Sequence, residues 1–344
     1  MPNVSRLHSV LFAIVVSVWA VLLFSMTRFG VDFEPLYFAA QRVFEGLSPY
    51  GADATNALAA QWPAQFAAAG IAYPLPIILL VAPLTWLPLS LAMALWISTG
   101  TVMAYRGIRL APLWPYIILL PLLFLPLHRN IMLGQATLVW FGLAVMLILA
   151  MKAPQPWLVG ATCALLVLKP QNGLLFALAG LAWGFRYDRR AMWWFAGCGG
   201  SLGLVSLLLQ PEWPYAWLQQ VQVYSNVVQP PSLLPWGLLV VLACWRLPWW
   251  ATVAAAQVVL FPLSDVYSTL PLLLCWVAIG GPAALLGAGI SWLWVMPDVS
   301  NTLNNVWVLI LCPLIACAIW RTLIAPRLAG MRLGDAPAST PEST

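Results

Sequence analysis

The segment IMLGQATLVWFGLAVMLILAM, residues 131–151, contains no side chain that is charged at neutral pH. A helix needs about 20 mostly apolar residues to cross the hydrocarbon core of a bilayer. This segment is therefore long and apolar enough to span a membrane. Similar segments recur along the chain, so the sequence predicts an all-helical protein that crosses a membrane several times.

The composition supports this fold class. Lys and Arg number 15 and Asp and Glu 10 among 344 residues, so 7% of the side chains are charged, whereas a soluble domain carries about 25%. Hydrophobic residues make up 62%, which leaves too little polar surface to cover a water-soluble globule of this size. The composition excludes a free cytosolic enzyme, a secreted disulfide scaffold and, despite the net charge of +5, a nucleic-acid binder.

Metal-ligating side chains are scarce. His8 and His128 are the two histidines, and the six cysteines form no CxxC pair and lie in apolar stretches. We expect the cysteines to act as small buried apolar side chains rather than as metal or redox ligands. Neither a nucleotide-binding loop nor a DxD metal motif is visible. We therefore expect no metal and no other cofactor.

The apolar stretches define the expected topology. Residues 8–27 lack a small-residue cleavage site, so they are expected to form a retained first helix rather than a removed signal peptide. Prolines and glycines interrupt many later stretches, and we expect about ten to twelve spans in all. One integral membrane domain is expected over 1–330, and a disordered cytoplasmic tail over 331–344. The other stretches are 75–105, 111–127, 131–151, 157–168, 172–185, 191–210, 233–245, 248–263, 268–280, 282–296 and 305–320.

The distribution of basic residues gives the orientation. With a cytoplasmic N-terminus and twelve spans, eleven of the fifteen Lys and Arg residues fall on the cytoplasmic side, and most acidic residues fall outside. This matches the excess of basic residues in cytoplasmic loops. The longest loops, 28–74 and 211–232, then lie at the outer face of the plasma membrane, where we expect any chemistry. Four basic residues fall on the outer side against this rule, and their position there needs a separate reason. They are Arg28, Arg42, Arg129 and Lys169.

The first outer loop begins with a predicted amphipathic helix. Apolar side chains recur at 33, 36, 37, 40, 43, 44 and 47, a helical spacing that places one apolar stripe against the membrane interface, with Arg42 directed elsewhere. Gly46 is the expected stop, and Asp32 lies just before the first turn. Asp32 is either an ordinary N-cap or a general base acting on a hydroxyl at the outer face.

Lys169 stands out among the later outer turns. It follows the apolar run Ala164-Leu165-Leu166-Val167-Leu168 and so lies near membrane depth, where an ammonium group costs free energy unless it has a partner or ligand. It either snorkels to lipid phosphates or, with Arg129, holds a lipid phosphate or diphosphate.

Polar and aromatic side chains near these turns remain open to two interpretations. Gln135 and Gln171 either bind a sugar or phosphate or join helices by hydrogen bonds. Tyr73 is either a membrane-interface anchor or part of a binding site. The Trp and Tyr side chains of the 211–232 loop either stack on a sugar ring or form an interfacial aromatic belt. Asp265 either positions an acceptor or pairs with an outward Arg.

Several short motifs, together with their order along the chain, resemble glycosyltransferase family 87, a group of multi-spanning enzymes of the GT-C superfamily. The resemblance covers about residues 30–190, and the later half matches only as an array of apolar helices. One departure is Tyr73-Pro74-Leu75-Pro76, where the family usually has Tyr-Pro-Pro. The resembling residues are Asp32-Phe33, Tyr37, Ala39-Ala40, Gly46, Pro49-Tyr50, Tyr73-Pro74, Pro83-Leu84, Leu87-Pro88, Trp96, Gly134-Gln135, Gly160 and Leu168-Lys169-Pro170-Gln171.

The resemblance implies a GT-C-like helical bundle that transfers a sugar, commonly mannose, from a polyprenyl-phosphate donor to a lipid or glycan acceptor at the outer face. It implies that Asp32 is the catalytic base and that Lys169, with Arg129, binds the donor phosphate. The expected substrate-binding set is Lys169, Gln171, Arg129, Asn130, Gln135, Tyr73 and Tyr37.

Two other functions fit the same sequence. A transporter or flippase for a lipid-linked sugar also needs a basic outer pocket and broken helices, but it does not need Asp32 as a base. A non-enzymatic membrane assembly subunit needs Asp32 and Lys169 only for stability.

Overall fold

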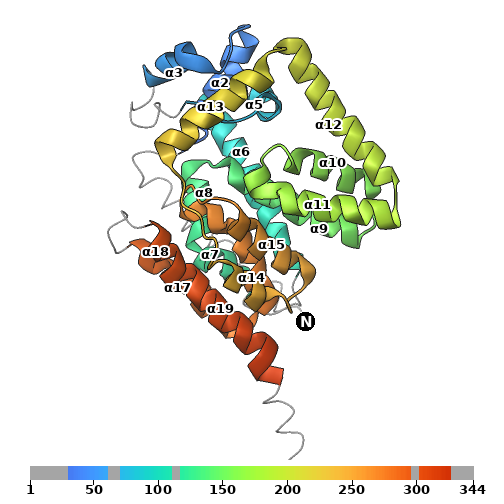
Figure 1. Ribbon diagram of the computed structural model, residues 1–344, viewed down its shortest axis with the longest axis vertical. Helices are drawn as coiled ribbons and strands as arrows, with labels where there is room; N and C mark the ends of the chain where they lie inside the picture. Colours follow the sequence, from blue (N-terminus) through green and yellow to red (C-terminus); the bar gives the residue numbers. More distant parts are fainter. Residues whose placement is uncertain (1–29, 61–69, 111–116, 296–301, 327–344) are drawn as a thin grey trace, which may run out of the picture.

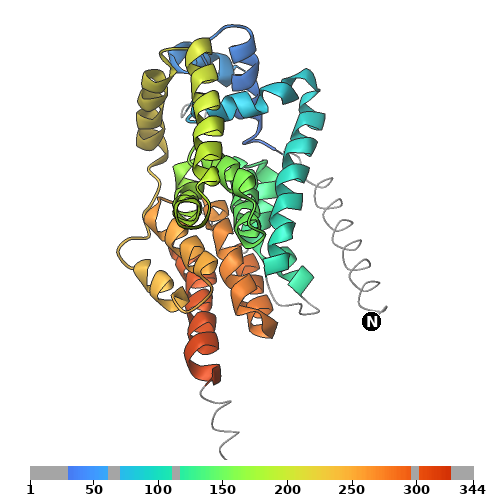
Figure 2. The ribbon, with the colours of Figure 1, turned by 90° about the vertical axis from the view of Figure 1, so that its right-hand side faces the viewer.

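The computed structural model describes residues 30–60, 70–110, 117–295 and 302–326, and within these ranges every regular element is helical. The expected first span at 8–27 and the expected tail at 331–344 lie outside the described residues. In Figures 1 and 2, α2, α3, α5 and α13 gather at one end of an elongated molecule, and α19 points away from them.

The N-terminal part forms short helices because proline and glycine interrupt it. α2 ends one residue before Glu45, and Gly46 follows with φ +73°, so the predicted stop is confirmed. The predicted single stretch 75–105 divides at Leu87-Pro88, where the backbone is extended. The elements are α2 (Glu34–Phe44), α3 (Gly51–Ala59), α5 (Leu75–Val81), η1 (Ala82–Trp86), α6 (Leu89–Tyr105) and η2 (Arg106–Leu110).

The predicted helix and its apolar stripe are present, but most of the stripe packs on α5 and η1 inside the protein rather than against a membrane interface. Leu36, Tyr37, Ala40 and Val43 are buried, whereas Phe44 is exposed. The expectation that Arg42 points away from the core is wrong, because Arg42 is buried. Its guanidinium lies 2.6 Å from the Asp53 carboxylate of α3 and donates to the Ser48 carbonyl.

A left-handed glycine separates two helices in the central part of the chain. α8 ends at Leu133, and Gly134 adopts φ +66°. The segment 131–151 is therefore the last turn of one helix and the whole of the next. The elements here are η3 (Ile117–Leu119), α7 (Leu120–Leu123), α8 (Leu125–Leu133), α9 (Ala136–Lys152), α10 (Pro156–Leu166), α11 (Pro170–Tyr187) and α12 (Arg190–Leu209).

α9, α10 and α11 pack side by side, and α12 packs on α10. Gly160 permits that approach, since a Cβ there would lie 2.2 Å from the Ala191 carbonyl oxygen. Close packing through small residues is typical of helices that associate in membranes.

The C-terminal part contains one clear difference from the sequence-based topology. The expected outer loop 211–232 is mostly the helix α13. The elements are α13 (Trp213–Val228), α14 (Leu238–Cys244), α15 (Trp249–Leu260), η4 (Val266–Leu272), α16 (Leu273–Ile279), α17 (Gly281–Ile290), η5 (Ser291–Val295), α18 (Thr302–Val306), η6 (Trp307–Leu311), α19 (Cys312–Ile319) and η7 (Trp320–Ile324).

Two helices among the described residues are both long and apolar enough to cross a membrane. They are Arg190–Leu209 and the continuous helical run Leu303–Ile324. Much of their apolar surface faces outward: Trp193 is 79% exposed and Leu208 is 73% exposed. The other apolar helices are shorter, at 10 to 17 residues.

Candidate functional site

One cavity of about 540 Å³ lies beneath α13. Five residues of the expected site line it: Asp32, Tyr73, Gln135, Lys169 and Gln171. These residues come from the segment before α2, the segment before α5, the start of α9 and the α10–α11 turn. The fold thus joins side chains that are far apart in the sequence.

Backbone contacts hold Asp32 in place. The amide of Gly30 donates to the Met132 carbonyl at 2.8 Å, and the amide of Asp32 donates to the Leu133 carbonyl at 2.9 Å. Gly134 is required here for two reasons. Its φ is positive, which L-residues with a Cβ rarely adopt, and a Cβ would lie 3.2 Å from the Gly30 Cα. The C-terminal end of α8 therefore anchors the segment that carries Asp32.

The side chain of Asp32 does not cap α2. The N-cap position is Phe33, and no side chain caps the helix, so the N-cap alternative is wrong. Instead, the Gln135 amide donates a hydrogen bond to the Asp32 carboxylate. Asp32 lies outside the expected spans, and burial raises its pKa from 3.8 to about 6, although Gln135, Arg129 and Lys169 lower it. A partly desolvated carboxylate that titrates near neutral pH is suited to accept a proton.

Lys169 is the N-cap residue of α11 and faces the same cavity. It is only 6% exposed. Its ammonium donates to the Thr137 hydroxyl at 3.2 Å and lies 5.3 Å from the centre of the Tyr73 ring. Within the described ranges no carboxylate lies within 4.0 Å of it. The turn lies outside both flanking spans, and burial lowers the pKa of Lys169 to about 7, with Asp32 opposing the shift.

A buried glutamine fixes the backbone that presents Lys169. Gln257 of α15 is fully buried; its Nε2 donates to the Pro170 carbonyl at 3.0 Å, and its Oε1 accepts from the Leu175 amide at 2.8 Å. Because these bonds reach the first two turns of α11, they hold the ammonium at the positive end of that helix's dipole. The ammonium and the helix N-terminus together favour an anionic ligand.

Three residues of the expected binding set do not line the cavity. Arg129 instead lies 3.2 Å from the Asp265 carboxylate. Asn130 is buried and donates to the Pro126 and Tyr267 carbonyls. The Tyr37 hydroxyl donates to the Leu87 carbonyl at 2.7 Å. Arg129, Asn130 and Tyr37 thus bind other parts of the protein rather than line the cavity. The outer basic residues Arg42 and Arg129 each have a carboxylate partner.

The cavity also contains aromatic residues outside the expected binding set, two of them from the 211–232 segment for which sugar stacking was one of two interpretations. Trp217 and Tyr224 come from α13, and Tyr267 comes from η4. A signal for α13 was present, since Trp213, Trp217, Val221, Tyr224 and Val228 recur at intervals of three or four residues. Such spacing places them on one helix face. Tyr267 carries no comparable signal. It lies in η4, and Asn130 donates a hydrogen bond to its backbone carbonyl.

A metal-free site remains an expectation from the sequence. No group of three His, Cys, Asp or Glu side chains gathers anywhere in the part of the chain that the structure describes. Asp32 is the one carboxylate among the described residues that line the cavity.

The fold and the cavity define a helical protein in which a carboxylate and a buried ammonium group line one cavity. Residues 71–319, more than half of the chain, match the family model described as glycosyltransferase family 87. The chain belongs to this family and is a glycosyltransferase. Tyr73, Gln135, Lys169 and Gln171 fall within the match, whereas Asp32 and Tyr37 precede it. No curated protein and no solved structure matches the chain.

Proposed function

We propose that this glycosyltransferase moves a hexose, with mannose as the first candidate, from a polyprenyl-phosphate donor to a hydroxyl of a lipid or glycan acceptor. The observation that carries the proposal is the single cavity in which the Asp32 carboxylate and the Lys169 ammonium both lie. A reaction that removes a proton from one substrate and leaves negative charge on the other needs these two groups.

The proposed reaction is a direct displacement. The acceptor oxygen forms a bond to the anomeric carbon, while the bond between that carbon and the donor phosphate oxygen breaks. The acceptor proton passes to the Asp32 carboxylate, and the bonding electrons leave with polyprenyl phosphate. With one carboxylate among the described cavity-lining residues, a single displacement is favoured, so the anomeric configuration inverts.

Lys169 and the first turn of α11 stabilise the leaving phosphate. The phosphate gains one negative charge when the glycosidic bond breaks, and an ammonium group in a partly desolvated site stabilises such charge more strongly than water does. The bound anion also favours the charged form of Lys169, which offsets the effect of burial on its pKa. Gln171, Tyr73 and Gln135 are proposed to contact the phosphate or the sugar.

The rest of the cavity is suited to the lipid part of the donor. Val221, Val228, Val258, Phe261 and Leu263 line it together with the polar residues. An isoprenoid chain buries its apolar surface against such side chains, which favours binding by about 25 cal/mol per Å². The polar and apolar linings therefore match the two halves of a polyprenyl-phosphate sugar.

We further propose that the chain is one multi-pass domain over 1–330 of the plasma membrane, with a cytoplasmic N-terminus and the site at the outer face. Support comes from the outward-facing apolar residues of α12 and Leu303–Ile324, since the core helix of a soluble protein is mostly buried. The basic sequence Arg186-Tyr187-Asp188-Arg189-Arg190 between α11 and α12 favours a cytoplasmic location for that end.

Sugar transfer in liposomes tests the proposal. Purified protein is given a panel of polyprenyl-phosphate hexoses and lipid acceptors, with wild type beside Asp32→Asn. The matched control is Glu45→Gln, which changes an exposed carboxylate in the same outer segment. The Asn variant can still accept the Gln135 hydrogen bond and removes a buried charge, so the fold is expected to survive.

We expect transfer by wild type and Glu45→Gln, and a rate at least about 100-fold lower for Asp32→Asn, with donor binding retained. Transfer at the wild-type rate by Asp32→Asn would refute the assignment of the base. Donor translocation without transfer in both proteins would support the flippase alternative instead.

A further inference from the structure

A groove of about 440 Å³ lies at the C-terminal ends of α9 and α11, the helices whose N-terminal ends face the candidate site. Gln135 and Lys169 are the N-caps of α9 and α11, whereas Lys152 and Arg186–Tyr187 lie where these helices end. α9 has 17 residues and α11 has 18, so the two sites are about 26 Å apart along the helices at about 1.5 Å per residue. This length is comparable with the hydrocarbon thickness of a bilayer.

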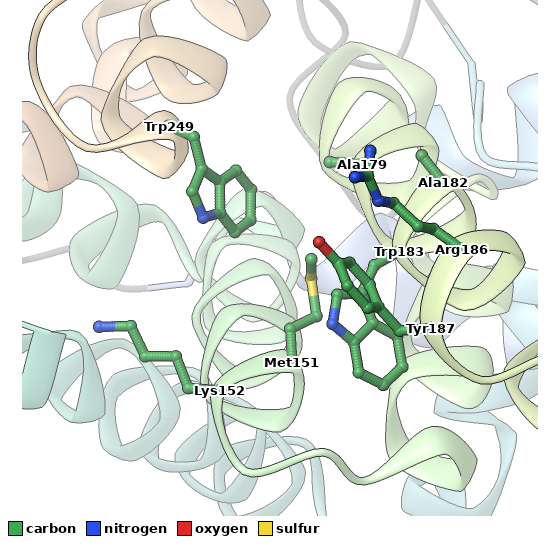
Figure 3. Close-up of a pocket in the computed structure, with 8 residues that line it drawn as sticks. All are labelled: Met151, Lys152, Ala179, Ala182, Trp183, Arg186, Tyr187 and Trp249. Carbon is green, nitrogen blue, oxygen red and sulfur yellow. The ribbon is translucent and has the colours of Figure 1, made fainter.

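The groove combines apolar and basic side chains. Figure 3 shows Met151, Trp183 and Tyr187 gathered together, with Trp249 facing them from α15. Ala179 and Ala182 complete the apolar lining. These two alanines of α11 leave a narrow apolar space beside the indole rings. An acyl chain needs a space of this shape.

Lys152 and Arg186 lie on opposite sides of this lining in Figure 3. Both are exposed, and no carboxylate lies within 4.0 Å of either among the residues that the structure describes. The Arg186 guanidinium lies 5.6 Å from the Tyr187 ring centre, which limits where the arginine can point. The groove therefore offers two positive charges and no negative one.

We propose that this groove binds one anionic phospholipid, with its headgroup at the basic rim that Lys152 and Arg186 form and an acyl chain against the tryptophans. Basic pockets between helices on the cytoplasmic side are typical sites for anionic headgroups. Trp and Tyr rings are favoured at headgroup depth, where one part of the ring is apolar and the other meets water. The inference rests on the proposed membrane location but not on the transfer reaction.

The lipid selectivity of the full-length protein tests this site. Protein in detergent micelles is titrated with phosphatidylglycerol and with phosphatidylcholine of the same acyl chains, and bound lipids are counted by native mass spectrometry. The test variant is Lys152→Gln with Arg186→Gln. The matched control is Arg106→Gln with Arg321→Gln, which removes two exposed basic residues outside the groove.

We expect wild type and the control to retain one phosphatidylglycerol at least about tenfold more tightly than phosphatidylcholine, a preference that two basic side chains near the headgroup can supply at about 1 kcal/mol each. The test variant should lose most of this preference, and millimolar inorganic phosphate should not displace the lipid. Equal binding of both lipids by wild type would overturn the proposal, and so would unchanged selectivity in the test variant.

The single variant Lys152→Gln is the safeguard if the double variant does not fold, because Lys152 also complements the carbonyls at the end of α9. It should lower the preference partway. Sugar transfer is measured separately on each variant, so failure of lipid binding is distinguishable from failure of the proposed reaction.

Discussion

The pH dependence of transfer follows from the environment of Asp32. Burial raises the pKa of this carboxyl to about 6, and a base acts only when it is deprotonated. As the pH falls through 6, the active form is lost. At this pKa the deprotonated fraction is about 90% at pH 7 and about 9% at pH 5, so kcat should fall at least about tenfold. A carboxyl at its ordinary pKa of 3.8 would lose less than about a tenth of its activity over this range.

The assay measures kcat at saturating donor between pH 5 and pH 8, because saturation separates the base from donor binding. The proposed donor is a phosphodiester, which keeps its charge throughout this range. The negative charge of the bound phosphate raises the pKa of Asp32 further. The fall in kcat between pH 7 and pH 5 therefore becomes larger. Intrinsic fluorescence at each pH verifies that the protein remains folded.

The control variants sharpen this test. Glu45→Gln should reproduce the wild-type profile, and the residual rate of Asp32→Asn should not change between pH 5 and pH 7. A folded wild-type enzyme whose kcat at pH 5 is within about twofold of that at pH 7 would refute the reasoning, because an unperturbed or uninvolved carboxyl predicts that result. In kcat/KM an additional loss is expected above pH 7, where Lys169 releases its proton in the free enzyme.

Three further changes test the site. Gln135→Leu removes the hydrogen bond that lowers the pKa of Asp32, so the pH at which kcat at saturating donor falls to half should move above 6. A lost substrate contact lowers kcat by the same factor at every pH, so a loss with an unchanged midpoint would contradict the role of this hydrogen bond. Lys169→Met should raise the donor KM about 10- to 100-fold, the value of a hydrogen-bonded charge, and an unchanged KM in steady-state kinetics would remove Lys169 from the phosphate site. Gly134→Ala should lower the unfolding free energy by about 1–3 kcal/mol, because it combines an unfavourable φ with a contact to Gly30. Gly46→Ala is its control, since Gly46 has a similar φ but open space around it, and equal melting temperatures for the two variants would contradict the contact.

Some local features were predictable from the sequence. Gly46 marks a predicted helix end, because positive φ acts on the backbone locally. Gly134 and Leu87-Pro88 also end helices, although the predicted stretches 131–151 and 75–105 ran through them. Asp32 and Lys169 were singled out for similar reasons, as charged residues at the ends of apolar segments. The helix α13 was missed, although its aromatic residues have helical spacing, because their composition equally describes an interfacial loop.

Partner choice could not be predicted for the outer basic residues. Arg129 and Lys169 both appeared as candidates for a phosphate site, yet Arg129 pairs with Asp265 and Lys169 has no carboxylate within 4.0 Å among the described residues. A guanidinium takes the carboxylate that the fold brings to it, and Asp265 is more than one hundred residues away in the chain. The sequence does not show how close these two residues lie in space.

The sequence alone determined that the chain is helical and that its surface is largely apolar, because composition and periodicity act over a few turns of helix. It also supplied the residues that carry the family resemblance. Only the tertiary structure decided which polar side chains share a cavity. Asp32 meets Gln135 because Gly134 allows the segment from Gly30 to Asp32 to pack on the end of α8. Lys169 faces the cavity because Gln257 holds the first turn of α11. These contacts depend on how helices pack, and packing joins residues whose separation in the sequence carries no information about their separation in space.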